Sequence, residues 1–309
     1  RPEVPQAMAQ CRQAGIRVVM ITGDHPRTAQ AIARQAGIDT TDVLTGDDMA
    51  DLDAATLSDH LASVNVFARV RPQQKLALVE ALKARGEVVA MTGDGVNDAP
   101  ALKAAHIGIA MGQRGTDVAR EAAALVLLQD DFSSIVHAIR LGRRTYANIA
   151  KYVRMGTSSN FGNMISVAVA SLFLPFLPLT PVQVLLNNLI YDLGEIGIPF
   201  DRAEADDLAH PHAWNLRDVL HFSIVMGPLS SAFDLATFAV LFFVFDASAE
   251  LFRTAWFVES MATQILVVFL IRTVGPAWRS RPHRVLVATS MAALAGALLL
   301  ALSPAGAVF

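Results

Sequence analysis

The sequence predicts two domains of different class: a soluble α/β domain with a mostly parallel sheet, followed by an all-α bundle of transmembrane helices. Charged residues make up only 17% of the 309 residues and hydrophobic residues 53%, whereas soluble domains carry about 25% charged residues. The charges are spread through residues 1–154, and none occurs in residues 155–191. In the first half, short β-branched runs alternate with helical segments, which is typical of a parallel α/β sheet.

The soluble domain is expected to cover residues 1–135. Helices are expected at residues 27–35 and 72–85, the second with a proline in its first turn. Short apolar runs predict the strands, at residues 18–21, 66–68, 88–91, 107–110 and 125–128. In parallel sheets of this kind ligands bind beyond the carboxyl ends of the strands. Two of the expected strands end there in Thr-Gly-Asp, so this edge is the predicted site.

The strongest motif is the string TGDGVNDAP, which runs from Thr92 to Pro100 directly after an expected buried strand. Its glycines permit a tight turn and a close approach of the backbone to a phosphate. Asp94 and Asp98 are hard oxygen ligands that suit Mg²⁺, and Asn97 can donate a hydrogen bond to a phosphoryl group. An isolated Gly-Asp-Gly would indicate only an ordinary turn, but the complete string favours a phosphoryl-transfer site.

This string resembles the hinge motif of P-type ATPases, whose phosphorylation domain belongs to the haloacid-dehalogenase superfamily. Two further matches agree: MITGD, which contains Thr22, Gly23 and Asp24, and FARVRPQQK, which ends at Lys75. The resemblance implies that Thr22 binds the transferred phosphoryl group and that Lys75 neutralises its charge, with Mg²⁺ as cofactor and ATP as substrate. Without the motif, Lys75 would be interpreted as a solvated surface lysine. A third Thr-Gly-Asp, residues 45–47, follows no clear strand and is expected to be a loop.

The departures from the family pattern are also informative. The chain contains no Asp-Lys-Thr-Gly-Thr string with the nucleophilic aspartate, no Thr-Gly-Glu of a dephosphorylating domain and no recognisable nucleotide-binding domain. We therefore expect roughly the last third of a pump, truncated at both ends. Its partners would be the missing domains of the same polypeptide, and on its own it should not hydrolyse ATP.

Residues 136–309 are expected to form a stalk and a membrane domain with about five spans. Residues 155–191 are too long for one crossing, so we expect two spans joined by a proline-rich turn. Three further spans are expected at residues 219–245, 255–271 and 285–302. Basic residues beside the spans mark the cytoplasmic side, which places residues 1–154 in the cytoplasm and the chain in the bacterial inner membrane, among lipid. The net charge of -3 gives no case for nucleic acid.

Polar residues inside expected spans are candidate cation ligands, because they are costly in lipid. Asn163 lies in the first span, and Asn188 and Asp192 lie four residues apart on one face of the second. Gly194 and Gly197 are expected to loosen this helix and to free carbonyl oxygens. Such an all-oxygen site suits magnesium or calcium. The alternative for the asparagines, and for Asn160, is hydrogen bonding between helices.

Three further acidic residues fall within the expected spans. Glu195 lies one turn from Asp192 and is a candidate to join the site. Asp234 is expected to hydrogen-bond Ser230 or Ser231 of its own helix, and Glu259 to lie near the outer interface. For both residues the alternative is that they bind the cation.

The membrane half is similar to the magnesium-transporting branch of the P-type ATPases, notably in SSNFGN, NLIYD and GPLSSAFD. The resemblance to the ion site of that branch implies that Asn163, Asn188 and Asp192 bind the transported ion. Where the branch has an amide near position 195, this chain has Glu195. We therefore expect an ATP-driven magnesium pump. The alternatives are a P-type pump for calcium or another cation, a haloacid-dehalogenase phosphatase with a membrane anchor, and a non-enzymatic binding fragment.

Overall fold

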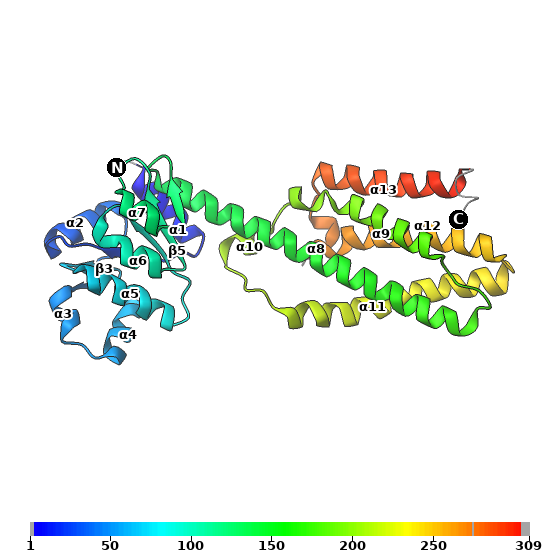
Figure 1. Ribbon diagram of the computed structural model, residues 1–309, viewed down its shortest axis with the longest axis horizontal. Helices are drawn as coiled ribbons and strands as arrows, with labels where there is room; N and C mark the ends of the chain where they lie inside the picture. Colours follow the sequence, from blue (N-terminus) through cyan, green and yellow to red (C-terminus); the bar gives the residue numbers. More distant parts are fainter. Residues whose placement is uncertain (1–2, 274, 304–309) are drawn as a thin grey trace. The chain divides into compact units, whose positions relative to one another are not determined.

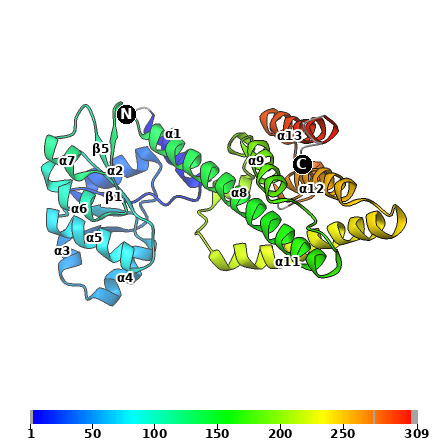
Figure 2. The same cartoon turned by 45° about the vertical axis from the view of Figure 1, so that its right-hand side comes forward.

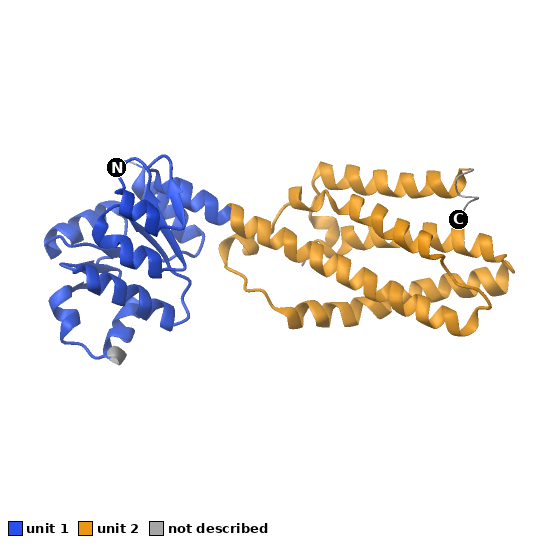
Figure 3. Ribbon diagram, in the orientation of Figure 1, with its two compact units in different colours: residues 1–140 blue, residues 141–309 orange. Residues whose placement is uncertain are grey.

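The computed structural model describes residues 3–273 and 275–303. The chain divides into two compact units, residues 1–140 and residues 141–309, which Figure 3 shows in blue and orange. The division falls inside one long helix, α8 (Phe132–Phe173). The domain boundary expected from composition, at residues 135 and 136, falls near the start of the same helix.

All six strands of the described part of the first unit pair in parallel (Figure 1). They form two sheets of three strands, one in the order β1-β3-β2 and the other in the order β4-β5-β6. The parallel pairing agrees with the sequence, but we expected one sheet, and no described hydrogen-bonded pair joins the two. The strands are β1 (Met20–Ile21), β2 (Val43–Thr45), β3 (Val66–Ala68), β4 (Ala90–Gly93), β5 (Ile107–Met111) and β6 (Leu125–Leu127).

The helices of the first unit begin at residues that suit a first turn. Pro26 and Pro72 open α2 and α5, where a missing backbone N–H costs nothing. Gly37 ends α2 with a φ of 77°, a conformation that favours glycine. The helices are α1 (Val4–Gln13), α2 (Pro26–Ala36), α3 (Gly46–Ala50), α4 (Ala54–Ser63), α5 (Pro72–Ala84), the 3₁₀ helix η1 (Val96–Asp98), α6 (Ala99–Ala104) and α7 (Asp117–Ala122).

The third Thr-Gly-Asp is not the loop that we expected. Strand β2 ends at Thr45, and the short helix α3 begins at Gly46. The Thr45 side chain accepts a hydrogen bond from the backbone N–H of Asp48, and the Asp48 carboxylate accepts one in return from the N–H of Thr45 at 2.9 Å. This capping box stabilises the helix start. We did not predict this strand because its apolar run is only Val43 and Leu44.

The core of the first unit forms around β3. Val66, Phe67 and Ala68 are fully buried, because this strand has neighbours on both edges and helices against its side chains. Leu61 of α4 and Leu78 of α5 pack with Phe67 in the same apolar cluster. The order β1-β3-β2 therefore fixes where the carboxyl end of β1 lies, next to the segment that follows β3.

The second unit is helical. A 3₁₀ turn follows α9, a π-helical turn ends α11, and Pro228 lies inside α11. The proline-rich turn expected between the first two spans lies between Phe173 and Pro181, and Pro181 opens the next helix. Besides α8 the elements are α9 (Pro181–Glu195), η2 (Ile198–Phe200), α10 (Ala205–Ala209), α11 (Leu216–Ala239), η3 (Val240–Val244), α12 (Ala249–Ile271), η4 (Ala277–Arg279) and α13 (Arg284–Leu302).

Three helices among the described residues are long and apolar enough to cross a membrane: Leu216–Val244, Ala249–Ile271 and Arg284–Leu302. They coincide with the last three spans expected from the sequence. The first two expected spans correspond to the C-terminal part of α8 and to α9. Helix α9 has only 15 residues, fewer than the ~20 that a perpendicular crossing needs. A total of five spans therefore stays a prediction.

Helices α9 and α13 pack closely, as Figures 1 and 2 both show. A side chain at Gly197 would place its Cβ 2.4 Å from the Cα of Leu286, and one at Gly194 would lie 3.2 Å from the Cβ of Ala293. The Gly194 carbonyl, expected to be free as a ligand, accepts a hydrogen bond from the Thr289 hydroxyl at 2.9 Å. These glycines therefore allow two backbones to meet, and Gly194 does not provide a free oxygen.

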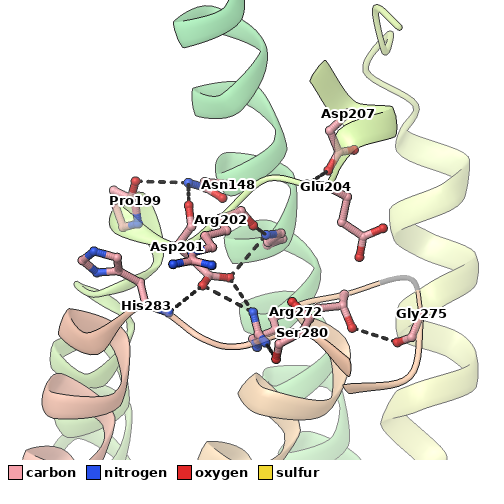
Figure 4. Close-up of polar contacts among 12 residues, drawn as sticks. Asn148, Pro199, Asp201, Arg202, Glu204, Asp207, Arg272, Gly275, Ser280 and His283 are labelled. Atoms are coloured by element: carbon pink, nitrogen blue, oxygen red, sulfur yellow. Dashed lines mark hydrogen bonds and ion pairs between the residues drawn. The ribbon is translucent and has the colours of Figure 1, made fainter. Parts of the chain in front are cut away.

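A buried cluster centred on Asp201 joins four segments of the second unit (Figure 4). The Asp201 carboxylate is fully buried and lies 3.4 Å from the Lys151 ammonium of α8 and 3.3 Å from the Arg272 guanidinium, which follows α12. It also accepts the backbone N–H of His283 at 3.1 Å, just before α13. Asn148 of α8 donates to the Asp201 carbonyl at 3.1 Å. One side chain thus ties the ends of several helices together.

The close packing at Gly197 makes a first prediction. Replacing Gly197 with alanine forces the Leu286 backbone to move, and overpacking of this kind costs about 1–3 kcal/mol. In the full-length protein purified in detergent, we expect Gly197→Ala to lower the thermal unfolding midpoint clearly. Gly296→Ala is the matched control on α13, because a Cβ there meets nothing within 4 Å. Equal midpoints for the two variants would contradict the packing.

The Asp201 cluster gives a second prediction. Asp201→Asn leaves two buried cations without their carboxylate, and removing one member of a buried ion pair costs about 3–5 kcal/mol. Thermal unfolding of the full-length protein should show a large loss of stability. Asp206→Asn, an exposed acid five residues away on α10, should unfold like the unmodified protein. A variant at Asp201 that is as stable as the Asp206 control would show that the cluster contributes little.

Candidate functional site

The loop after β4 is built around Asp98. A Cβ on Gly93 would lie 2.5 Å from the Cβ of Asp98, so only glycine fits at that position. The backbone N–H of Gly95 donates to Asp98 Oδ2 at 3.2 Å. The buried carboxylate of Asp98 therefore holds the glycine turn in shape from within.

Lys75 reaches the same carboxylate from another element. Its ammonium nitrogen lies 2.7 Å from Asp98 Oδ1, and the two side chains are only 16% and 12% exposed. Lys75 is in the first turn of α5, whose start is fixed by Pro72. A short charge-assisted contact between largely buried groups is stronger than a surface ion pair. Lys75 is thus a held, partly desolvated cation beside the glycine loop and not a freely solvated lysine.

Thr22 lies at the carboxyl end of β1. The Phe67 carbonyl accepts its N–H at 2.9 Å, and its own carbonyl accepts the N–H of Val70 at 3.0 Å. The Thr22 hydroxyl accepts the Asp24 N–H at 3.1 Å, while Gly23 and Asp24 are exposed. Backbone bonds therefore attach this turn to the segment that leads into the helix of Lys75. No hydrogen bond joins the side chains of Thr22 and Lys75 in the described structure.

Asp94 and Asn97 have exposed side chains, with no hydrogen bond recorded for either side chain in the described structure. An open carboxylate at Asp94 fits a ligand for Mg²⁺, which usually takes one or two protein carboxylates together with phosphate oxygens. Asp98 fits less directly, because its two oxygens already accept from Lys75 and Gly95. Within residues 3–273 and 275–303, no three His, Cys, Asp or Glu side chains are grouped to hold a metal ion.

The expected cation ligands of the second unit lie on α8 and α9. Asn163 and Asn188 are half-buried, and Asp192 is exposed. No hydrogen bond or ion pair connects the three side chains in the described structure, so it does not assemble them into one closed site. Asn160 is exposed as well.

Glu195, one turn from Asp192 on α9, is in a different environment from the candidate ligands. Glu195 is buried, whereas Asp192, three residues earlier on α9, is exposed. Asn187 and Tyr191 share the buried face with Glu195, and we did not identify them from the sequence. Positions 187, 191 and 195 repeat every four residues, but this spacing does not show which side of the helix is buried, since Asn188 and Asp192 have the same spacing.

Asp234 is held by other helices and not by its own. Its carboxylate accepts the Ser166 hydroxyl of α8 at 2.5 Å and the Trp256 indole N–H of α12 at 3.2 Å. The expected partner Ser231 instead donates to the Gly162 carbonyl at 2.8 Å. The expectation was wrong because tertiary partners across the bundle compete with neighbours along one helix. Glu259 is half-buried, and its Oε2 has no hydrogen-bond partner in the described structure.

The Asp201 cluster was also missed. From the sequence we predicted no buried contact for Asp201 or Arg272. Both are buried, and the only sequence signal was the isolated acid after the apolar run that ends at Phe200.

Models of two protein families match most of the chain. The haloacid dehalogenase-like hydrolases match residues 1–106, and a second model of that description matches residues 74–139. The C-terminus of the cation transporting ATPases matches residues 176–309. The matches cover the parallel α/β unit and the helices from the proline-rich turn onward.

Known relatives include pumps for different cations. The magnesium-transporting ATPase, P-type 1, of Escherichia coli K12 is 41% identical over 86% of this chain and 30% of its own length. The calcium-transporting ATPase of Bacillus subtilis is 38% identical over 92% of the chain and 33% of its own length. Calcium-transporting ATPase 1 of Bacillus cereus is 49% identical over 67% of the chain and 24% of its own length. The chain thus spans between a quarter and a third of the relatives' length. With its haloacid-dehalogenase-like unit and apolar helices, it belongs to the P-type cation ATPases.

Proposed function

We propose that the protein to which this chain belongs is an ATP-driven magnesium pump. The chain supplies the charge-stabilising part of the phosphoryl-transfer site and part of the cation site. The observation that carries the first assignment is the ion pair of Lys75 and Asp98 at 2.7 Å, set in a loop where Gly93 admits no side chain. A pre-positioned cation of this kind stabilises charge as a phosphoryl group is transferred.

The roles in phosphoryl transfer follow from placement. Lys75, already oriented by Asp98, neutralises the transferring phosphoryl group, and the Thr22 hydroxyl and the Asn97 amide bind its oxygens. Gly23 and Asp24 shape the turn that holds Thr22. When bound at Asp94, Mg²⁺ supplies further neutralisation of phosphate charge. The nucleophilic aspartate that the family uses belongs to a string that this chain does not contain.

The cation site is proposed from oxygen ligands on two helices. Asn163 of α8 and Asn188 and Asp192 of α9 offer two amide oxygens and a carboxylate, all of which are hard ligands. Helix α8 is continuous from Phe132 to Phe173. It carries Asn163 and also includes the last residues of the first unit, so we infer that it transmits motion between the two sites.

Features of the membrane half favour magnesium over calcium as the transported ion. The residues between Gly156 and Phe173 of α8 include no carboxylate, and a weakly charged site suits an ion that gives up its waters reluctantly. The relatives named for magnesium also match across most of the chain. Calcium is the second candidate, because relatives named for calcium are of similar identity and Glu195 adds a carboxylate. We place the protein in the cell membrane, with residues 1–154 in the cytoplasm.

The role of Lys75 can be tested in the full-length pump. Lys75→Met removes the cation that balances the transferring phosphoryl group, so we expect phosphoenzyme formation from radiolabelled ATP to fall by about 100-fold or more. Lys103→Met changes an exposed lysine of α6 in the same unit and should phosphorylate normally. Phosphorylation of the Lys75 variant at the rate of this control would exclude the assigned role.

The transported ion can be tested in liposomes that contain the full-length pump. We expect ATP to drive movement of magnesium across the membrane, measured with an entrapped magnesium-sensitive dye, and Asp192→Asn to abolish it. Glu250→Gln, which changes an exposed acid on α12, is the control and should transport normally. Calcium transport without magnesium transport would identify the second candidate, and normal transport by Asp192→Asn would remove that residue from the site.

A further inference from the structure

The third Thr-Gly-Asp, residues 45–47, is a motif that the proposed function leaves without a role. Its glycine is buried, at the join between strand β2 and helix α3. A Cβ on Gly46 would lie 2.4 Å from the carbonyl oxygen of Arg69 and 2.7 Å from Oε1 of Gln74. Because the nearest atom belongs to the backbone, no side chain fits there unless the chain moves. Glycine therefore allows the turn after β2 to approach the segment that follows β3.

Gln74 fastens these two segments together from the start of α5. Its Nε2 donates to the Gly46 carbonyl at 2.6 Å, and its Oε1 accepts the backbone N–H of Arg71 at 2.9 Å. The second bond satisfies one of the N–H groups that a helix start leaves free, as in a capping box. Both polar ends of this half-buried side chain are thus engaged, and the next residue along α5 is Lys75.

The segment between β3 and α5 is also held from its other side. The N–H of Arg69 donates to the Asp24 carbonyl and the N–H of Val70 to the Thr22 carbonyl, both at 3.0 Å. Strand β3 lies between β1 and β2, so these bonds and the contact at Gly46 come from opposite edges. Arg69 has a φ of 51°, in the left-handed region that residues with side chains rarely adopt. Such a conformation persists only where the surroundings impose it, which the contacts on both edges do.

These contacts determine where Lys75 lies. Its ammonium nitrogen is 2.7 Å from Asp98 Oδ1, so a displacement of the first turn of α5 moves the charge that the phosphoryl group would meet. Misplacement of a catalytic group by about 1 Å can lower a rate by about 100-fold. The ion pair of Arg71 and Asp47, at 3.4 Å, adds little to this positioning, because both side chains are largely exposed.

We propose that Gly46 and Gln74 are positioning residues for phosphoryl transfer and that they act through Lys75. Gly46 lets the turn between β2 and α3 dock on the segment before α5, and Gln74 ties that turn to the first turn of the helix. The proposal rests on the proposed role of Lys75. It gives the third Thr-Gly-Asp a function, which is to support the charge-stabilising lysine from the edge of β3 opposite to Thr22.

The test is the rate constant of phosphoenzyme formation from radiolabelled ATP in the full-length pump. We expect Gly46→Ala and Gln74→Ala each to lower it by about tenfold at saturating ATP. The ATP concentration for half-maximal rate should stay unchanged, because neither residue is proposed to contact the nucleotide. Gln73→Ala is the matched control and should phosphorylate normally, since Gln73 precedes Gln74 on the same turn and is exposed. Gln74→Ala adds no atom to a crowded place, so it carries the test if Gly46→Ala does not fold.

A double-mutant cycle separates positioning from general structural support. If Gln74 acts through Lys75, Gln74→Ala should cost nothing further in the Lys75→Met background, whereas the effects of independent residues add. An equal loss in both backgrounds overturns the proposal, and so does a Gln74→Ala rate constant equal to that of Gln73→Ala. Normal phosphorylation by Lys75→Met would instead remove the proposed role of Lys75, and the positioning role with it.

Discussion

The Asp201 carboxylate, buried between Lys151 and Arg272, is the contact on which the arrangement of the second unit depends. It lies just past the end of η2 and engages α8, the segment after α12 and the start of α13. A charge removed from water needs this many partners to be stable. With them it fixes the ends of the helices that carry the candidate cation ligands, so Asn163 of α8 and the candidate ligands of α9 keep a defined relation.

The same requirement for partners applies to the other carboxylates of the chain. Asp234 has partners on α8 and α12, and Asp98 has them in Lys75 and the Gly95 N–H. These carboxylates hold structure together, and in the case of Asp98 they orient a catalytic cation. Asp94, in contrast, is open to solvent. An open carboxylate is available to a ligand, so the structure separates the binding candidate Asp94 from the positioning residue Asp98.

Much of the fold could be predicted because the signals were local. Apolar runs located five of the six described strands, and prolines marked the starts of α5 and α9. Strand β2 was missed because its apolar run is only Val43 and Leu44. The phosphoryl site could be predicted because its motif is contiguous from Thr92 to Pro100, but the ion pair that Lys75 forms with Asp98 joins residues 23 apart and needed the structure.

The membrane half was harder to predict for a physical reason. Its hydrophobic background gives no inner and outer pattern, so the sequence could not show that Asp192 is exposed while Glu195 is buried. The partners of Asp201 lie 50 and 71 residues away, beyond the range of any periodicity. From the sequence we expected Gly194 and Gly197 to loosen the helix. The structure shows instead that glycine is needed there because α13 approaches closely.

The central claim is that cation binding on α9 and phosphoryl transfer beside Lys75 are coupled in one protein. The most direct measurement is the amount of phosphoenzyme formed from ATP by the full-length pump as free magnesium is raised, compared between the unmodified protein and Asp192→Asn. The account predicts that the variant needs at least ten times more magnesium for half-maximal phosphorylation. Superimposable curves would contradict it.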